Sequence, residues 1–181
     1  MTVWAVVIAF FGATNPFRRR TALSVPRVRT LVGGAVGAVT SYAVLAIVGA
    51  NARDTLDVSA PNARIAAGLV LVVVGLHALA TAPTAPMLMD DAAHAWLNPA
   101  WFPVLLRPDL AVVALAAHDA GAVASVVVAA AVAFGATAYW WNAHGRSTAS
   151  VTRVERALGA ASGVALVVAA VRLLLDGVFA V

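Results

Sequence analysis

The chain has no cysteine and no lysine, and only 11% of its 181 residues are charged. Without cysteine, neither disulfide bonds nor thiolate metal sites can form. With 62% apolar residues and so little charge, the composition lies far outside that of soluble domains and excludes a water-soluble globule. The absence of lysine, together with heavy use of alanine and valine, suggests a GC-rich prokaryotic genome.

The sequence also lacks the motifs of common enzymes. It has no metal-ligand spacing, nucleophile triad, phosphate-binding loop or dinucleotide fingerprint, so we expect no catalytic residue, no cofactor and no bound metal. The isoelectric point is near 11.0, but the few arginines are better explained as topology signals than as a nucleic-acid surface. We therefore expect no nucleic-acid partner.

Long apolar runs define the class of protein. Residues 31–50 and 120–141 contain no charge, and residues 65–82 contain one histidine. Because about 20 apolar residues span the hydrocarbon of a bilayer, each run predicts a transmembrane helix, with the lipid bilayer as its partner. Residues 158–181 are long enough to form a fourth.

Two segments are less regular. Residues 3–14 form an apolar run with the length of a half-helix or re-entrant element, and arginines follow it, so we expect it to be retained rather than cleaved as a signal. Residues 101–117 are interrupted by Arg107-Pro108-Asp109. As a single helix, residues 109–141 would extend about 50 Å, which is too long for one crossing. We therefore predict a tight hairpin at residues 118–121.

The arginine distribution predicts the orientation. Five arginines lie between the first two apolar segments, two lie in the next loop, none lies in residues 83–99, and three lie in the last loop. The positive-inside rule places the first and last of these loops in the cytoplasm. The sequence thus predicts six spans in a prokaryotic plasma (inner) membrane, with both the N- and the C-terminus outside.

Two parts of the sequence resemble each other, and we call this internal similarity the echo. The pair Asn15-Pro16 ends the first short apolar segment, and a second pair, Asn98-Pro99, begins another such segment at a distance of 83 residues. Residues 63–73 are also similar in sequence to residues 158–168. Two such halves predict a transporter-like 3+3 inverted repeat. The expected fold is an all-α integral membrane protein with one membrane domain (1–181), in which three-helix repeats (1–82 and 98–181) are joined by a cytoplasmic loop (83–97).

The two Asn-Pro pairs are the first candidates for a substrate site. Proline breaks a helix and frees backbone carbonyls, and asparagine adds a neutral donor and acceptor. At the midplane of the membrane, an ion or a polar substrate could be bound by the two pairs, Asn15 with Pro16 and Asn98 with Pro99. Alternatively, both pairs are helix boundaries, because the residue before proline disfavours helix.

Ionisable residues at membrane depth supply further candidates. The echo pairs His77 with Arg172, which would line a shared substrate cavity. The alternatives are a hydrogen-bonded imidazole inside the bundle for His77, and for Arg172 an i, i+4 pair with Asp176 that reaches the outer surface. Asp109, His118 and Asp119 are candidates for proton or ion coupling, and Asp109 also for substrate binding. His118 and Asp119 could instead lie in an exposed outer turn.

Small-residue faces predict close helix contacts. The faces are formed by Gly33, Gly34 and Gly37 in the second span and by Gly159 and Gly163 in the sixth. We expect these faces to pack against other helices of the same chain, and the alternative is that they form a homodimer interface.

Short motifs along nearly the whole chain resemble one known family. They comprise the first Asn-Pro pair, Arg64-Ile65-Ala66-Ala67-Gly68 with Gly75, Pro103 and Pro108, Gly159 and Gly163, and Leu174-Leu175-Asp176-Gly177. In order and spacing they resemble the MarC family, six-span inner-membrane proteins grouped with the LysE-type exporter superfamily. The resemblance implies an inverted repeat and transport of small solutes. The chain departs at two places from the glycine-containing motifs usual in that family, at Phe17-Arg18-Arg19-Arg20 and at Arg107-Pro108-Asp109.

The sequence thus favours a transporter-like protein, not an enzyme, that exports a small polar or cationic solute by alternating access. The alternative is a structural or accessory subunit of a membrane complex that transports nothing. A cavity at the midplane would favour the transporter, and a core filled by alanine, valine and leucine would favour the scaffold.

Overall fold

The computed structural model describes residues 3–17, 28–81, 105–117, 119–144 and 153–180. This part of the chain is helical and contains no strand, which confirms the predicted all-α class. The helices are α1 (Val3–Thr14), α2 (Val28–Thr55), α3 (Ala60–Ala80), α4 (Pro108–Leu115), α5 (Ala120–His144) and α6 (Arg153–Val178).

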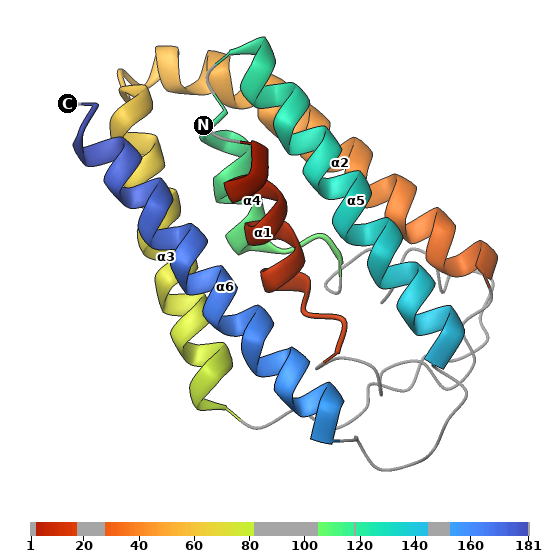
Figure 1. Cartoon of the computed structure of the whole chain (residues 1–181). Coiled ribbons are helices and arrows are strands. Elements are labelled where there is room, and N and C mark those ends of the chain that lie inside the picture. The colour runs from red at the N-terminus through yellow and green to blue at the C-terminus, as the bar shows by residue number, and fades with distance from the viewer. Residues whose placement is uncertain (1–2, 18–27, 82–104, 118, 145–152, 181) are drawn as a thin grey trace.

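The four long helices form two pairs that enclose the two short ones (Figure 1). Helix α3 packs along α6, and α2 packs along α5. Helices α1 and α4 lie between these pairs: α1 contacts α5 and α6, and α4 contacts α2 and α3. Both chain termini lie at the same end of the bundle (Figure 1).

Four helices of the described chain, α2, α3, α5 and α6, are long and apolar enough to cross a membrane. The protein is therefore a membrane protein, as its composition predicts. Helix α1 has 12 residues and α4 has 8, which correspond to about 18 and 12 Å at 1.5 Å per residue. Neither crosses a 30 Å hydrocarbon core on its own, so the count of six spans stays a prediction.

Local sequence explains where the short elements begin and end. Helix α1 ends at Thr14, and the next residue, Asn15, has a φ of 39°, in the left-handed region that asparagine tolerates. Pro16 follows and cannot continue the helix. Helix α4 begins with Pro108 in its first turn, where a missing backbone N–H costs no helical hydrogen bond.

The predicted hairpin lies between α4 and α5. Asp119 precedes α5, and its Oδ1 accepts a hydrogen bond from the backbone N–H of Ala122 at 2.6 Å. This carboxylate caps the first turn of α5, where a negative charge also suits the helix dipole. Asp119 is exposed, as the outer-turn alternative expects.

Glycines allow α3 and α6 to pack with their backbones close together. A Cβ on Gly68 of α3 would lie 2.8 Å from the backbone nitrogen of Leu174 and 2.9 Å from the carbonyl oxygen of Ala170, both on α6. On α6, a Cβ on Gly163 would lie 2.8 Å from Leu79 of α3. The glycine face of the sixth span is thus used for packing within the chain.

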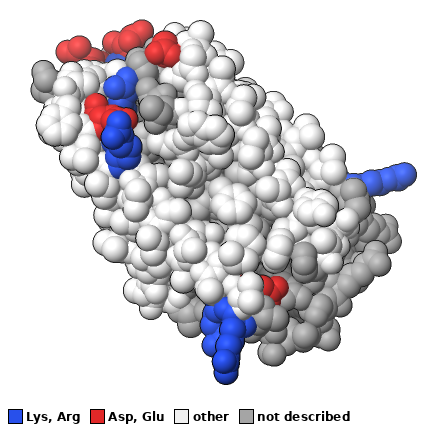
Figure 2. Space-filling view, viewed as in Figure 1, with Lys and Arg blue, Asp and Glu red and all other residues white. Residues whose placement is uncertain are grey.

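Charged side chains gather toward the two ends of the visible face, and a wide uncharged band separates them (Figure 2). Asp54 and Asp57 lie beside the turn between α2 and α3. Arg153 and Arg156 lie in the first turn of α6, at the opposite end of the bundle. This separation suits an apolar layer between two polar interfaces.

We expect Gly68→Ala to destabilise the fold, because the added methyl group meets backbone atoms of α6 and must push the helices apart. Overpacking of this kind costs about 1–3 kcal/mol. Gly135→Ala is the matched control, since a Cβ at Gly135 has no neighbour within 4 Å. Unfolding of the purified protein by sodium dodecyl sulfate would measure the stability of both variants. Equal stability of the two variants would contradict close α3–α6 packing.

Candidate functional site

A buried ion pair lies at the start of α4. Nε of Arg107 donates to Oδ1 of Asp109 at 2.9 Å, and Nη2 donates to Oδ2 at 2.8 Å. The side chains are only 13% and 7% exposed. Two parallel hydrogen bonds fix the guanidinium and the carboxylate in one plane, which is the strongest geometry for such a pair.

The third interaction of the guanidinium reaches α1. Nη1 of Arg107 donates to the carbonyl oxygen of Ala13 at 2.8 Å. Ala13 lies in the last turn of α1, where carbonyls have no intrahelical partner and the helix dipole is negative. The Thr14 hydroxyl bonds the carbonyl oxygens of Phe10 and Phe11 at 2.9 and 3.0 Å. The end of α1 is therefore satisfied by a cation from the other half of the chain and by its own threonine.

Tyr42 fixes the segment that leads into α4. Its hydroxyl oxygen accepts from the backbone N–H of Arg107 at 2.8 Å and donates to the carbonyl oxygen of Leu105 at 2.9 Å. Tyr42 is fully buried and lies near the middle of α2. The segment from Leu105 to Arg107 is therefore held beside the middle of α2, a helix long and apolar enough to cross a membrane.

An aromatic cluster packs around the Tyr42 ring. The ring centroid of Phe10 from α1 lies 5.0 Å from that of Tyr42, and the two planes meet at 80°. Phe134 from α5 lies 5.7 Å from Tyr42 and 6.0 Å from Phe10. The two contacts of Phe10 are edge-to-face, which is a favourable arrangement, and the Tyr42–Phe134 pair is tilted at 32°. Together the three rings connect α1, α2 and α5 beside the polar site.

A second arginine terminates α4. Nη1 of Arg53, near the end of α2, donates to the carbonyl oxygen of Leu115 at 2.7 Å and also to that of Ala117. Arg53 is buried. The C-terminal ends of both short helices thus meet an arginine guanidinium supplied by the opposite half of the chain.

Asn15 has a donor that is satisfied and an acceptor that is not. Its Nδ2 donates to the carbonyl oxygen of Gly159 on α6 at 2.9 Å. Its Oδ1 is buried without a hydrogen-bond partner. The carbonyl oxygen of Pro16 accepts from Nε1 of Trp141 at 3.1 Å. The break after α1 is therefore held by α5 and α6, and one polar oxygen remains available inside the protein.

The structure brings some predicted residues together and separates others. Asn15 and Pro16 lie at the end of α1, and Asp109 lies two residues beyond Arg107, whose side chain bonds the same helix end. Asn98, Pro99 and His118 lie outside the described residues.

His77 and Arg172 are both exposed on the outer surface of the α3–α6 pair rather than directed into the bundle. Arg172 pairs with Asp176 at 3.1 Å, as the i, i+4 alternative expects.

Sequence reasoning missed the three residues that organise the site, Tyr42, Arg53 and Arg107. Tyr42 lies within an apolar run where nothing marks it as polar. Arg53 is one of the two arginines between the second and third apolar runs, where an arginine predicts orientation and not the end of another helix. Arg107 carried a usable signal, because an arginine two residues before an aspartate, with a proline between them, places a cation and an anion beside a helix start.

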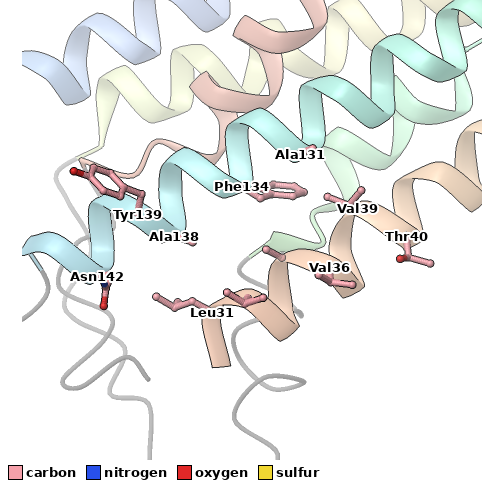
Figure 3. A pocket seen from close by; sticks show the side chains of 12 residues that line it. Leu31, Val36, Val39, Thr40, Ala131, Phe134, Ala138, Tyr139 and Asn142 are labelled. Carbon is pink, nitrogen blue, oxygen red and sulfur yellow. The ribbon is translucent and has the colours of Figure 1, made fainter. Parts of the chain in front are cut away.

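The described residues bring no group of three histidine, aspartate or glutamate side chains close enough to hold a metal ion. They do form an apolar groove of about 570 Å³ between α2 and α5, open on one side (Figure 3). Phe134 contributes to its wall.

No family model, curated protein or solved structure matches the chain.

We expect Arg107→Gln to destabilise the protein by about 3–5 kcal/mol, because the Asp109 carboxylate would be left buried without its cation. Removing both charges, in Arg107→Gln with Asp109→Asn, should cost less than Arg107→Gln alone. The exposed pair of Arg172 and Asp176 is the control and should show coupling of about 0.5 kcal/mol or less. Additive losses at Arg107 and Asp109 in the unfolding assay would contradict the ion pair.

Proposed function

We propose that this protein is a membrane transporter that exports a small polar or cationic solute by alternating access. The observation that carries the proposal is the buried pair of Arg107 and Asp109 at the helix break. Ionisable groups at membrane depth are costly, and where they occur they usually lie on a substrate or ion path. Here Arg107 contacts the end of α1 and Asp109 lies in the first turn of α4, so solute binding at either charge would act on both short helices.

Asn15 supports a solute path at the same helix end. Its buried Oδ1 has no partner, and an unpaired buried acceptor costs about 1–3 kcal/mol. A hydrogen-bond donor on a solute, or a cation, would remove that cost. A polar solute with an ammonium or hydroxyl group therefore suits this position.

The contact pattern supports an inverted repeat. Exchanging α1, α2 and α3 for α4, α5 and α6 preserves the principal helix contacts: α2 with α5, α3 with α6, and each short helix with the two long helices of the other half. Helix α1 runs away from the end that carries both termini, and α4 runs toward it (Figure 1). This relation suits an inverted-topology transporter, in line with the resemblance to the MarC family.

The second candidate is a scaffold subunit without transport. It is favoured by the core of the described bundle, which small and branched apolar side chains fill. Among them, Leu110, Val113, Ala114, Ala129 and Ala133 are fully buried. A core of this kind also suits a transporter closed around an empty site, so the two candidates differ in whether the site opens.

Access to Ala13 distinguishes the two candidates. Because the chain has no cysteine, Ala13→Cys can be labelled alone with a membrane-impermeant thiol reagent. In oriented vesicles, we expect a transporter to be labelled slowly from each side, since the site opens to both. A cysteine at Ala170, fully buried between α3 and α6, is the control that should stay unlabelled. Labelling of Ala13→Cys from neither side, or from one side alone, would contradict alternating access.

Comparison of cells lacking the protein with complemented cells tests transport directly. We expect a small polar solute to accumulate inside the deletion strain and to be cleared by the wild-type gene. Asp109→Asn should fail to clear it while still reaching the membrane. Equal solute contents in all three strains would favour the scaffold.

The predicted orientation of the chain in the membrane can be tested by cysteine labelling. We expect Ser59→Cys, exposed beside the turn between α2 and α3, to be labelled from outside intact cells. Asn142→Cys, exposed in the last turn of α5, should be labelled only after permeabilisation. The reverse result would place both termini in the cytoplasm.

A further inference from the structure

The groove between α2 and α5 has the dimensions of one lipid acyl chain. Its α2 wall runs from Leu31 to Thr40, and its α5 wall runs from Ala131 to Asn142. At 1.5 Å per residue these walls are about 14 and 16 Å long. A leaflet contributes half of the 30 Å hydrocarbon core, so the groove covers the depth of one leaflet.

The floor and walls of the groove are apolar. Phe134 closes the floor, and small residues, Ala35, Ala131, Gly135 and Ala138, keep it open. A Cβ at Gly135 would meet nothing within 4 Å, so the space beside it is free. Because α2 and α5 are both long and apolar enough to cross a membrane, we expect lipid tails rather than water around this groove.

Polar groups mark one end of the groove. Tyr139 and Asn142 line that end together with Leu31, whereas Thr40 and Ala131 lie at the other end (Figure 3). Arg29, two residues before Leu31 and exposed, adds a positive charge there. A cation and an amide beside the mouth of an apolar groove complement a negatively charged headgroup. The arginine distribution places this end in the cytoplasmic leaflet, where anionic lipids attract basic residues.

We propose that the α2–α5 groove binds one anionic phospholipid, with an acyl chain between the helices and the phosphate beside Arg29 and Asn142. The site is separate from the Arg107–Asp109 pair, although Phe134 contacts both the groove and the aromatic cluster around Tyr42. The bound chain supports the wall on which Tyr42 packs.

Native mass spectrometry of the delipidated protein in detergent tests the site. The probes are dioleoyl phosphatidylglycerol and dioleoyl phosphatidylcholine, which share their chains and differ in headgroup charge. We expect the wild type to bind one phosphatidylglycerol about fivefold more tightly than phosphatidylcholine, since one arginine near the surface contributes about that factor. Equal binding of the two lipids would overturn the proposal.

Two variants separate the acyl chain from the headgroup. Gly135→Leu should fill the groove and weaken binding of both lipids at least about tenfold, which corresponds to losing about two buried methylene contacts. Arg29→Gln should remove only the preference for phosphatidylglycerol. The matched controls are Ala124→Leu, exposed on α5 beyond the groove, and Arg156→Gln, exposed at the same end on α6. Both should bind as the wild type does.

The controls also exclude other occupants. A Gly135→Leu protein that keeps full lipid affinity but loses a dimer present in the wild type would assign the groove to a second copy and overturn the proposal. A loss of affinity in Ala124→Leu as large as in Gly135→Leu would show nonspecific adsorption and also overturn it. Arg29→Gln changes only an exposed side chain, so it tests the headgroup contact even where Gly135→Leu folds poorly.

Discussion

The carbonyl groups at the C-terminal ends of two short helices constrain the rest of this structure. Backbone groups inside a bilayer must be bonded within the protein, because no water is present to satisfy them. The same need applies to the buried helix ends here: α1 ends inside the bundle, and α4 ends just before the buried Ala116 and Ala117, beside the turn before α5. Each end receives an arginine, Arg107 at Ala13 and Arg53 at Leu115. A guanidinium suits this position because it remains charged and presents several donors in one plane. The aspartate at 109 then balances the charge of Arg107 in the interior.

This arrangement makes the two halves of the chain depend on each other. Each short helix is terminated by a cation from the opposite half and is enclosed by long helices of that half. In the described part of the chain, the terminal carbonyls of Ala13 and Leu115 each receive a guanidinium from the other half. Tyr42 strengthens the connection, because its hydroxyl holds the segment from Leu105 to Arg107 against the middle of α2. A change at the ion pair would therefore reach α1, α2 and α4 together, which is the coupling that the proposed transport cycle would require.

Much of the fold could be predicted from the sequence, because hydrophobic length and proline act locally. The four long helices, the break after Asn15 and the short connection before α5 follow from apolar runs and turn residues. The site could be predicted only in part. Asp109 and Asn15 are conspicuous as polar residues beside prolines, but the bonds of Arg107 to Ala13 and of Arg53 to Leu115 are made to backbone carbonyls, which leave no mark in a sequence. The echo between His77 and Arg172 was misleading in space, since both side chains lie on the outer surface, and helix periodicity alone does not show which face is inside.

The central claim is that an ionised Arg107–Asp109 pair terminates α1 inside the membrane protein. The infrared difference spectrum between the wild type and Asp109→Asn, recorded in lipid bilayers at neutral pH, tests it most directly. The account predicts that the wild type contributes the stretching bands of an ionised carboxylate, and that these bands are absent from Asp109→Asn, in which Arg107 keeps its bond to the Ala13 carbonyl. A protonated carboxyl band that disappears in Asp109→Asn would contradict it.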